Sequence, residues 1–183
     1  MKLVLSLPNK HCLSDPLPTW LLKANVDILS PFLCQLFNRC LEHGIVPSSF
    51  KSGYVTPLLK KADLDAADVK SYRPITKLSV LSKLLERLVA QQLTEYLTEN
   101  GLLPELQSAY RVHHSTETAM LKVMGDILLA LDSGNLAMLS LLDLSAAFDT
   151  VDHDTLLRRL HTSYCFDGIV IKWFISYLSG RVQ

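Results

Sequence analysis

The sequence has 183 residues, of which 49% are hydrophobic, so it can bury the core of one or two domains. Lysine and arginine total 18, as do aspartate and glutamate, so the net charge does not indicate a nucleic-acid partner. No apolar run approaches the length of a transmembrane helix, so no membrane partner is expected.

The start of the chain and the cysteines indicate where the protein resides. Pro8 and Lys10 interrupt the apolar start too early for a secretory signal peptide. The four cysteines form no CxxC pair, which is typical of reduced thiols inside the cell. We therefore expect a protein of the cytoplasm or nucleus that is not secreted.

Charge is distributed unevenly along the chain. Residues 51–91 hold eight basic and four acidic residues, whereas residues 92–183 hold six basic and eleven acidic residues. A basic patch beside an acidic region fits a phosphate-binding surface next to a metal site. Ordinary solvated helix faces also explain these counts, and charge alone favours that simpler interpretation.

The first 52 residues are predicted to be mainly helical. Prolines interrupt residues 1–17, which we expect to form a loop, and residues 19–28 have the pattern of a short helix. Ser30 and Pro31 match an N-cap followed by proline in the first turn, which predicts a new helix that ends at Gly44.

A short hairpin is predicted next. Residues 54–59 (YVTPLL) favour an edge strand, because Pro57 has no amide proton to donate to a sheet. Residues 60–71 are charged and small, as in a turn or mobile loop. Pro74 keeps Arg73 out of helical geometry, so residues 53–59 are expected to pair with residues 73–78.

Helices account for most of the remaining chain. Residues 79–100 carry a single apolar stripe, and Asn100-Gly101 ends it. Ser115 is expected to cap a helix that runs to about residue 132, and residues 154–161 and 169–178 are also predicted to be helical. The stripe of the first of these helices consists of Val80, Leu81, Leu84, Leu85, Leu88, Val89, Leu93, Tyr96 and Leu97.

One stretch, residues 137–153 (AMLSLLDLSAAFDTVDH), carries the strongest functional signal. Its uncharged start predicts a buried strand at residues 136–142, and Asp143 ends that run. A carboxylate at the tip of a buried strand is costly unless it is solvated, paired or bound to metal. From the residues alone, a helix N-cap or a solvated strand end explains Asp143 as well.

This stretch resembles the first palm motif of the reverse transcriptases of non-long-terminal-repeat retrotransposons. Further blocks resemble the same group in the same order: VTPLLKK, YRPITKLSVLSKLLERLV, LPELQSAYRVHHSTETAML and WFISYLSGRVQ. The likeness is greatest to chicken-repeat-type and related animal elements. It implies a helix-rich α+β fold containing the fingers and the first part of the palm of a right-hand polymerase, incomplete in this chain. It divides the chain into an amino-terminal helical extension of the fingers (1–52), the fingers (53–135) and the start of the palm (136–183).

The resemblance assigns metal chemistry to the palm motif. Asp143 matches the first catalytic aspartate, and the backbone carbonyl of Leu144 would face the second metal ion. The expected cofactor is Mg²⁺, which prefers oxygen ligands and keeps several waters. Asp149 does not match a catalytic position, and we expect it to cap a helix or form a salt bridge.

The resemblance also implies nucleotide contacts. Lys60, Lys61 and Arg73 match the basic residues of the fingers that meet the incoming triphosphate, although a solvated basic loop would contain the same residues. Phe148 matches the steric gate, where an aromatic ring excludes the ribose 2′-hydroxyl. Simple core packing is the alternative for this ring.

Template contacts are implied for the block QSAYRVHHST. Gln107, Tyr110 and Arg111 would lie beside the template strand, where a ring can stack on a base and polar groups can contact its backbone. His113 and His114 are expected to be ordinary exposed loop histidines.

No aromatic-Ala-Asp-Asp turn and no Asp-Asp pair occur in the sequence. We therefore expect a fragment of an RNA-directed DNA polymerase, inactive alone, whose complete enzyme would use an RNA template, a DNA primer and deoxynucleotides. The alternative is a non-enzymatic remnant that binds RNA weakly or has no function.

Overall fold

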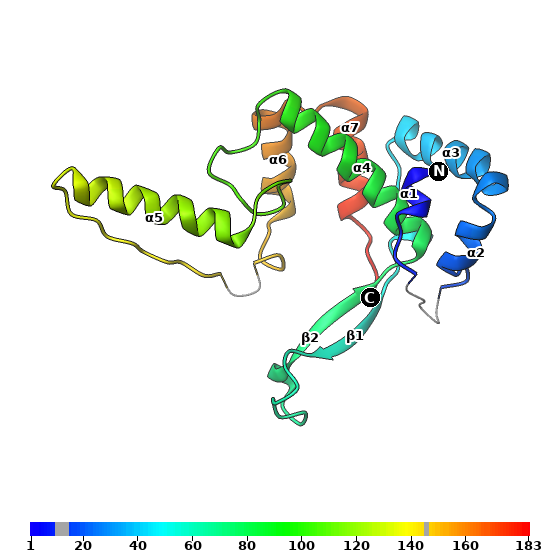
Figure 1. Ribbon diagram of the computed structural model, residues 1–183. Coiled ribbons are helices and arrows are strands. Elements are labelled where there is room, and N and C mark those ends of the chain that lie inside the picture. The colour runs from blue at the N-terminus through cyan, green and yellow to red at the C-terminus, as the bar shows by residue number, and fades with distance from the viewer. Residues whose placement is uncertain (10–14, 145–146) are drawn as a thin grey trace. The chain divides into compact units, whose positions relative to one another are not determined.

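The computed structural model describes residues 1–9, 15–144 and 147–183. The chain divides into two compact units, the first formed by Met1–Tyr96 with Asp152–Gln183 and the second by Leu97–Val151. Over the described residues, seven α-helices and one two-stranded sheet give a helix-rich α+β fold (Figure 1). None of the helices in this part of the chain is both long and apolar enough to span a bilayer.

The elements of the first unit are mostly helices. They are α1 (Lys2–Leu5), α2 (Thr19–Ala24), α3 (Val26–His43), β1 (Tyr54–Leu59), β2 (Tyr72–Lys77), α4 (Val80–Glu99), α6 (His153–Tyr164) and α7 (Gly168–Leu178). Two short 3₁₀ turns, Ser48–Phe50 and Val69–Ser71, precede the two strands. The second unit contains α5 (Thr116–Asp132).

The core of the first unit forms around the amino-terminal half of α4. The predicted apolar stripe is confirmed there, because Leu84 and Leu85 are almost fully buried and Leu88 packs against the same cluster. α3 contributes Phe37, and α7 contributes Trp173. Full burial of such a side chain stabilises the fold by about 1.5–3 kcal/mol, so this stripe holds the helices together.

The start of α4 is capped by two polar side chains. The Asp15 carboxylate accepts a hydrogen bond from the Val80 amide at 2.6 Å, and the Ser79 hydroxyl accepts one from the Ser82 amide at 3.2 Å. Both satisfy amides that have no partner within the helix. The Ser82 hydroxyl in turn donates to the Phe50 carbonyl at 2.9 Å, which ties α4 to the segment before β1.

Two predictions for the amino-terminal region are wrong. Residues 1–17 were expected to form a loop, but α1 forms at Lys2–Leu5 because Val4 is buried in the core. The helix break expected at Ser30-Pro31 lies at Asn25 instead, and α3 continues through Pro31. Pro31 lies in the second turn, where it removes a single helical hydrogen bond, and the Ser30 hydroxyl donates back to the Val26 carbonyl rather than acting as a cap.

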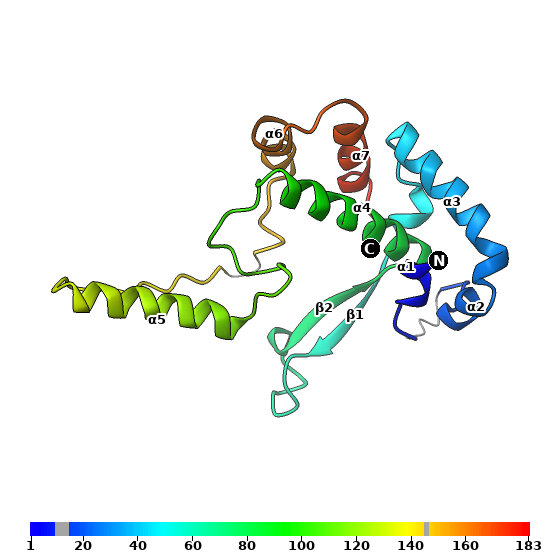
Figure 2. The ribbon, with the colours of Figure 1, turned by 45° about the horizontal axis from the view of Figure 1, so that its top comes forward.

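The predicted hairpin is confirmed as an antiparallel ribbon of β1 and β2, in which Pro57 lies opposite Pro74. In an antiparallel ribbon, opposed residues alternate between hydrogen-bonded and non-hydrogen-bonded pairs. The Lys60 amide donates to the Ser71 carbonyl, which sets where this alternation begins. By this alternation Pro57 and Pro74 form a non-hydrogen-bonded pair. Both prolines are tolerated because neither position has to donate an amide proton to the opposite strand. All strand residues except Leu59 and Tyr72 are exposed, and the ribbon extends away from the helices of its unit (Figure 2).

The second unit contains α5 and an extended segment, residues 135–144, that runs beside it (Figures 1 and 2). The predicted cap is confirmed as a capping box formed by Ser115 and Thr118. The predicted strand at residues 136–142 is wrong, because no strand in the described part of the chain pairs with it. A strand needs a hydrogen-bonded neighbour, and this segment instead leaves Leu136 100% and Leu142 92% exposed.

Candidate functional site

One face of the β1–β2 ribbon is basic. Side chains alternate along a strand, so Arg73 and Lys77 lie on the same face of β2. Lys60 directly follows β1 and lies two residues beyond Leu58, the register partner of Arg73, and its amide donates to the Ser71 carbonyl. Lys60 and Arg73 therefore lie at the same end of the ribbon, where one phosphate chain can contact both.

The turn at the end of the ribbon is ordered by its own hydrogen bonds. The Asp65 and Asp68 carboxylates accept from the amides of Ala67 and Lys70, each at 2.9 Å. The Tyr72 hydroxyl donates to the Ala66 carbonyl at 3.0 Å. These acids are therefore occupied with backbone amides rather than with the basic side chains.

The basic groups of this region differ in how they are held. The Lys60 ammonium donates to the Lys70 carbonyl at 2.7 Å, which fixes it across the turn. Lys61 and Arg73 are exposed and have no ion-pair partner among the described residues. The two salt bridges found there, Lys122–Asp126 and Glu86–Arg181, lie elsewhere. Arg73 is thus free to bind an anion without first breaking an ion pair.

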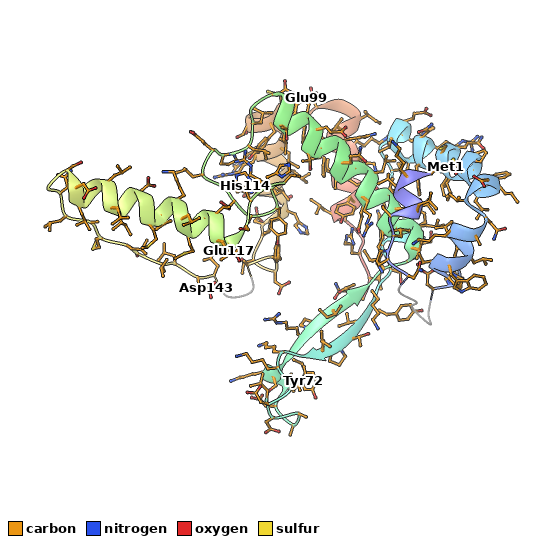
Figure 3. The ribbon with its side chains drawn as sticks, in the orientation of Figure 1. Met1, Tyr72, Glu99, His114, Glu117 and Asp143 are labelled. Carbon is orange, nitrogen blue, oxygen red and sulfur yellow. The ribbon has the colours of Figure 1, made fainter. Side chains whose placement is uncertain are left out.

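Asp143 and Leu144 lie at the exposed end of the extended segment, and Phe148 is 77% exposed. Figure 3 shows Asp143 at the same end of α5 as Glu117. Hydrogen bonds from Ser115 and from its own backbone lower the pKa of Glu117. No three acids, histidines or cysteines gather around a metal position in the described residues, so these residues do not assemble a metal site alone.

The cap of α6 is formed by a different aspartate from the one expected. Asp152, and not Asp149, accepts the hydrogen bond of the Thr155 amide at 2.7 Å. This contact lowers the pKa of Asp152. Asp149 was expected either to cap a helix or to form a salt bridge. It does not cap α6, because that helix begins at His153 and its cap directly precedes it, and neither salt bridge found among the described residues includes Asp149.

The loop before α5 is held by Arg111. One of its terminal nitrogens donates to the carbonyls of Pro104, Glu105 and Gln107, at 2.9, 3.2 and 3.2 Å. The side-chain amide nitrogen of Gln107 donates to the Ala109 carbonyl at 3.2 Å. Tyr110 has a left-handed backbone (φ 60°), and its side chain is 87% exposed, so its ring faces solvent.

His114 lies directly before the α5 cap, as labelled in Figure 3, and its ring nitrogen contacts the Val112 carbonyl at 2.9 Å. The prediction that His114 is an exposed loop histidine is confirmed.

Lys77 on the basic ribbon face was not among the predicted site residues. Its spacing of four residues from Arg73 in a strand was the available signal, because such residues share a face.

The predicted site residues are divided between the two units. Lys60, Lys61 and Arg73 belong to the first unit, and the structure brings Lys60 and Arg73 to the same end of the ribbon. The others belong to the second unit: Gln107, Tyr110, Arg111, Asp143, Leu144 and Phe148.

Comparison with known proteins identifies one family. Residues 59–183 match the model of the reverse transcriptase (RNA-dependent DNA polymerase) family. The chain is 33% identical over 129 residues to the probable RNA-directed DNA polymerase from transposon BS of Drosophila melanogaster, which covers 70% of this chain and 14% of that protein.

Two further relatives from the same fly show the same pattern. The RNA-directed DNA polymerase from mobile element jockey is 30% identical over 155 residues, covering 83% of this chain and 17% of the relative. The probable RNA-directed DNA polymerase from transposon X-element is 30% identical over 150 residues, covering 82% and 16%. The chain thus spans less than a fifth of the length of these curated relatives.

Proposed function

We propose that this chain forms part of an RNA-directed DNA polymerase, because it belongs to the reverse transcriptase family. Within that family it belongs to the non-long-terminal-repeat retrotransposons, the group that includes the jockey, R1 and X-element types. Its partners would be an RNA template, a DNA primer and deoxynucleotides. Within this group we assign it to the chicken-repeat type, on the motif resemblance alone.

The basic ribbon face carries the nucleotide part of this proposal. Arg73 lies on that face, Lys60 lies at the same end of the ribbon, and Arg73 has no competing ion pair in the described residues. We assign the triphosphate of the incoming nucleotide to this face, with Lys61 as a further cation beside the turn. The planar fork of Arg73 suits phosphate oxygens, whereas Lys60 supplies a fixed point charge.

Asp143 is proposed as the catalytic carboxylate, with the Leu144 carbonyl beside it. The family is generally metal-dependent, and Mg²⁺ is the ion we propose. Among the described residues, no group of three acids, histidines or cysteines gathers around Asp143. Phe148 is proposed as the steric gate for the sugar, since its exposed ring is available to a ligand.

The loop before α5 is proposed to contact the template. The exposed ring of Tyr110 is free to stack on a base, and stacking of this kind contributes about 1–3 kcal/mol per base. Gln107 can contact the strand beside it. Arg111 would act mainly by holding the loop in shape, because one of its terminal nitrogens contacts three carbonyls of that loop.

The larger architecture is part of the same proposal. We assign residues 1–52 to an extension of the fingers, residues 53–135 to the fingers and residues 136–183 to the start of the palm of a right-hand polymerase. We also place the protein in the cytoplasm or nucleus, where its template RNA would be found.

A second candidate function is RNA binding without catalysis. It is favoured by the exposed cations of the ribbon, Lys61, Arg73 and Lys77, which can bind the phosphates of an RNA strand. The two candidates differ in what the ribbon binds, because only a polymerase needs a triphosphate site there.

A nuclear magnetic resonance titration of the 183-residue chain with a deoxynucleoside triphosphate tests the first candidate. The expected result is a set of shifts at the Lys60 and Arg73 amides that saturates with ligand. Shifts from a single-stranded RNA at the ribbon, with none from the triphosphate, would instead support the second candidate.

A further inference from the structure

The segment before β1, residues 46–53, is tied to α7 and to the chain that follows it. The Ser176 hydroxyl accepts hydrogen bonds from the Val46 amide at 2.9 Å and from the Lys51 ammonium at 3.4 Å. Val182 forms a parallel bridge with Ser52. We call residues 46–53 the ribbon foot.

The bridge to Val182 fixes the ribbon where it leaves the helices. The Gly53 amide donates to the Val182 carbonyl at 3.0 Å, and the Val182 amide donates to the Lys51 carbonyl at 3.3 Å. A Cβ atom on Gly53 would lie 2.6 Å from the Thr76 methyl carbon, so β2 closely approaches the foot here. Movement of residues 180–183 would therefore be transmitted directly to both strands.

Arg181 holds these last residues in place. Its Nε donates to the Tyr177 carbonyl at 2.9 Å, and its Nη2 lies 3.4 Å from Glu86 Oε1 on α4. The guanidinium carbon lies 4.1 Å above the centre of the Tyr177 ring, a cation–π contact. One side chain thus contacts both α4 and α7.

Tyr177 completes this contact. Its hydroxyl donates to the same Glu86 oxygen at 2.8 Å, and its ring stacks on Trp173 with centroids 5.1 Å apart. Burial and the neighbouring Glu86 carboxylate raise the pKa of Tyr177 to about 12, so the hydroxyl stays a donor at neutral pH. Glu86, Tyr177 and Arg181 are referred to below as the clamp.

We propose that Arg181 is a positioning residue: through the clamp it holds residues 180–183 against the ribbon foot and so sets the direction of the ribbon that carries Lys60 and Arg73. The proposal rests on the nucleotide role proposed for that ribbon face. An isolated surface ion pair contributes little, but here the ion pair, the ring contact and the backbone bridge act on the same short segment.

Amide hydrogen exchange of the whole chain, followed by nuclear magnetic resonance, tests the clamp. In Arg181→Ala, the Gly53 and Val182 amides should exchange about three- to tenfold faster, while the Leu84 and Leu85 amides change less than about twofold. Tyr177→Phe keeps the ring and removes one hydrogen bond, so it should give a smaller change in the same direction. Arg159→Ala, on an exposed face of α6, is the matched control and should change neither pair.

Arg181→Lys separates charge from shape. It keeps a positive charge near Glu86 but loses the planar group over the Tyr177 ring, so it should restore only part of the protection at Gly53. An unchanged exchange rate at Gly53 in Arg181→Ala would overturn the proposal. So would an equal increase at Leu84 and Leu85, because the residue would then act on general stability.

Inorganic tripolyphosphate serves as the probe for the nucleotide role. In the wild-type chain it should shift the Lys60 and Arg73 amides, and Arg181→Ala should raise the dissociation constant about threefold or more with the same amides affected. An unchanged dissociation constant would overturn the link between clamp and ligand. If the wild-type chain shows no shift while Gly53 exchange responds as expected, the triphosphate site fails and the clamp is still supported.

Discussion

Replacement of Arg73 by alanine should weaken triphosphate binding by a calculable amount. Arg73 is exposed and has no ion pair in the described residues, so no existing contact has to be broken before it binds phosphate. A hydrogen bond to a charged group contributes about 1.5–3 kcal/mol, and solvent screening at an exposed site favours the lower end. Since about 1.4 kcal/mol corresponds to a factor of ten, a loss of about 1.5 kcal/mol in Arg73→Ala should raise the dissociation constant about twelvefold.

Lys77 provides a matched control on the same ribbon face. It lies four residues from Arg73, or about 13 Å along an extended strand. This distance exceeds the screening length of about 10 Å at 0.1 M salt, so Lys77→Ala should change the dissociation constant less than about twofold there. At 0.01 M salt the screening length is about 30 Å, and the effect of Lys77→Ala should grow.

The assay is titration of the 183-residue chain and its two variants with a deoxynucleoside triphosphate at both salt concentrations. The ribbon amides report binding, and the α4 amides report whether each variant keeps its fold. Equal effects of the two substitutions at 0.1 M salt would refute the assignment, because general attraction to a basic surface would then explain binding without a site at Arg73.

Three further substitutions test the core, the clamp and the sugar contact. Leu84→Ala should lower the free energy of unfolding by about 2–5 kcal/mol in urea titration, because Leu84 is 2% exposed, whereas Leu121→Ala on the exposed face of α5 should change it by less than about 0.5 kcal/mol. The raised pKa of Tyr177 predicts a contribution to stability that is complete below its ordinary pKa near 10 and is lost as pH rises towards about 12. Between pH 9 and 12, the free energy of unfolding should therefore fall less steeply with pH in Tyr177→Phe than in the wild-type chain. An equal slope in both would show that other groups cause the loss. In the polymerase completed with the segment that follows this region in a jockey-type relative, Phe148→Ala should admit ribonucleotides, and unchanged sugar selectivity in single-nucleotide incorporation would reject the gate.

Local sequence patterns correctly predicted those secondary-structure elements that are determined by residues close together in the chain. The stripe containing Leu84 and Leu85 predicted α4, and Ser115 correctly marked the start of α5. The prolines of the ribbon predicted an exposed hairpin, because residues without an amide proton fit only certain pairs of a two-stranded sheet.

Predictions failed where distant contacts decide the structure. Val4 forms part of a helix because the core buries it, although the prolines after it predicted a loop. Residues 136–142 have the composition of a buried strand, but a strand also needs a neighbouring strand to which it can hydrogen-bond. No strand in the described part of the chain pairs with this segment, so its composition alone did not make it a strand.

The candidate site shows the same division. Motif blocks predicted Arg73 and Asp143 as site residues, and the register then showed that Lys77 shares a strand face with Arg73. The contact between Arg181 and Glu86 could not be predicted from the sequence, because Glu86 lies 95 residues earlier and only folding brings the two side chains together.

Primer extension on an RNA template tests the central claim most directly. The 183-residue chain alone should give no product, and joining it to the segment that follows this region in a jockey-type relative should restore extension of a DNA primer. Asp143→Asn in the joined protein should abolish the activity, while Asp149→Asn, the matched control six residues away, should retain it. Extension that survives in Asp143→Asn, or that is lost equally in both variants, would contradict the assignment of Asp143 as the catalytic carboxylate of a reverse transcriptase.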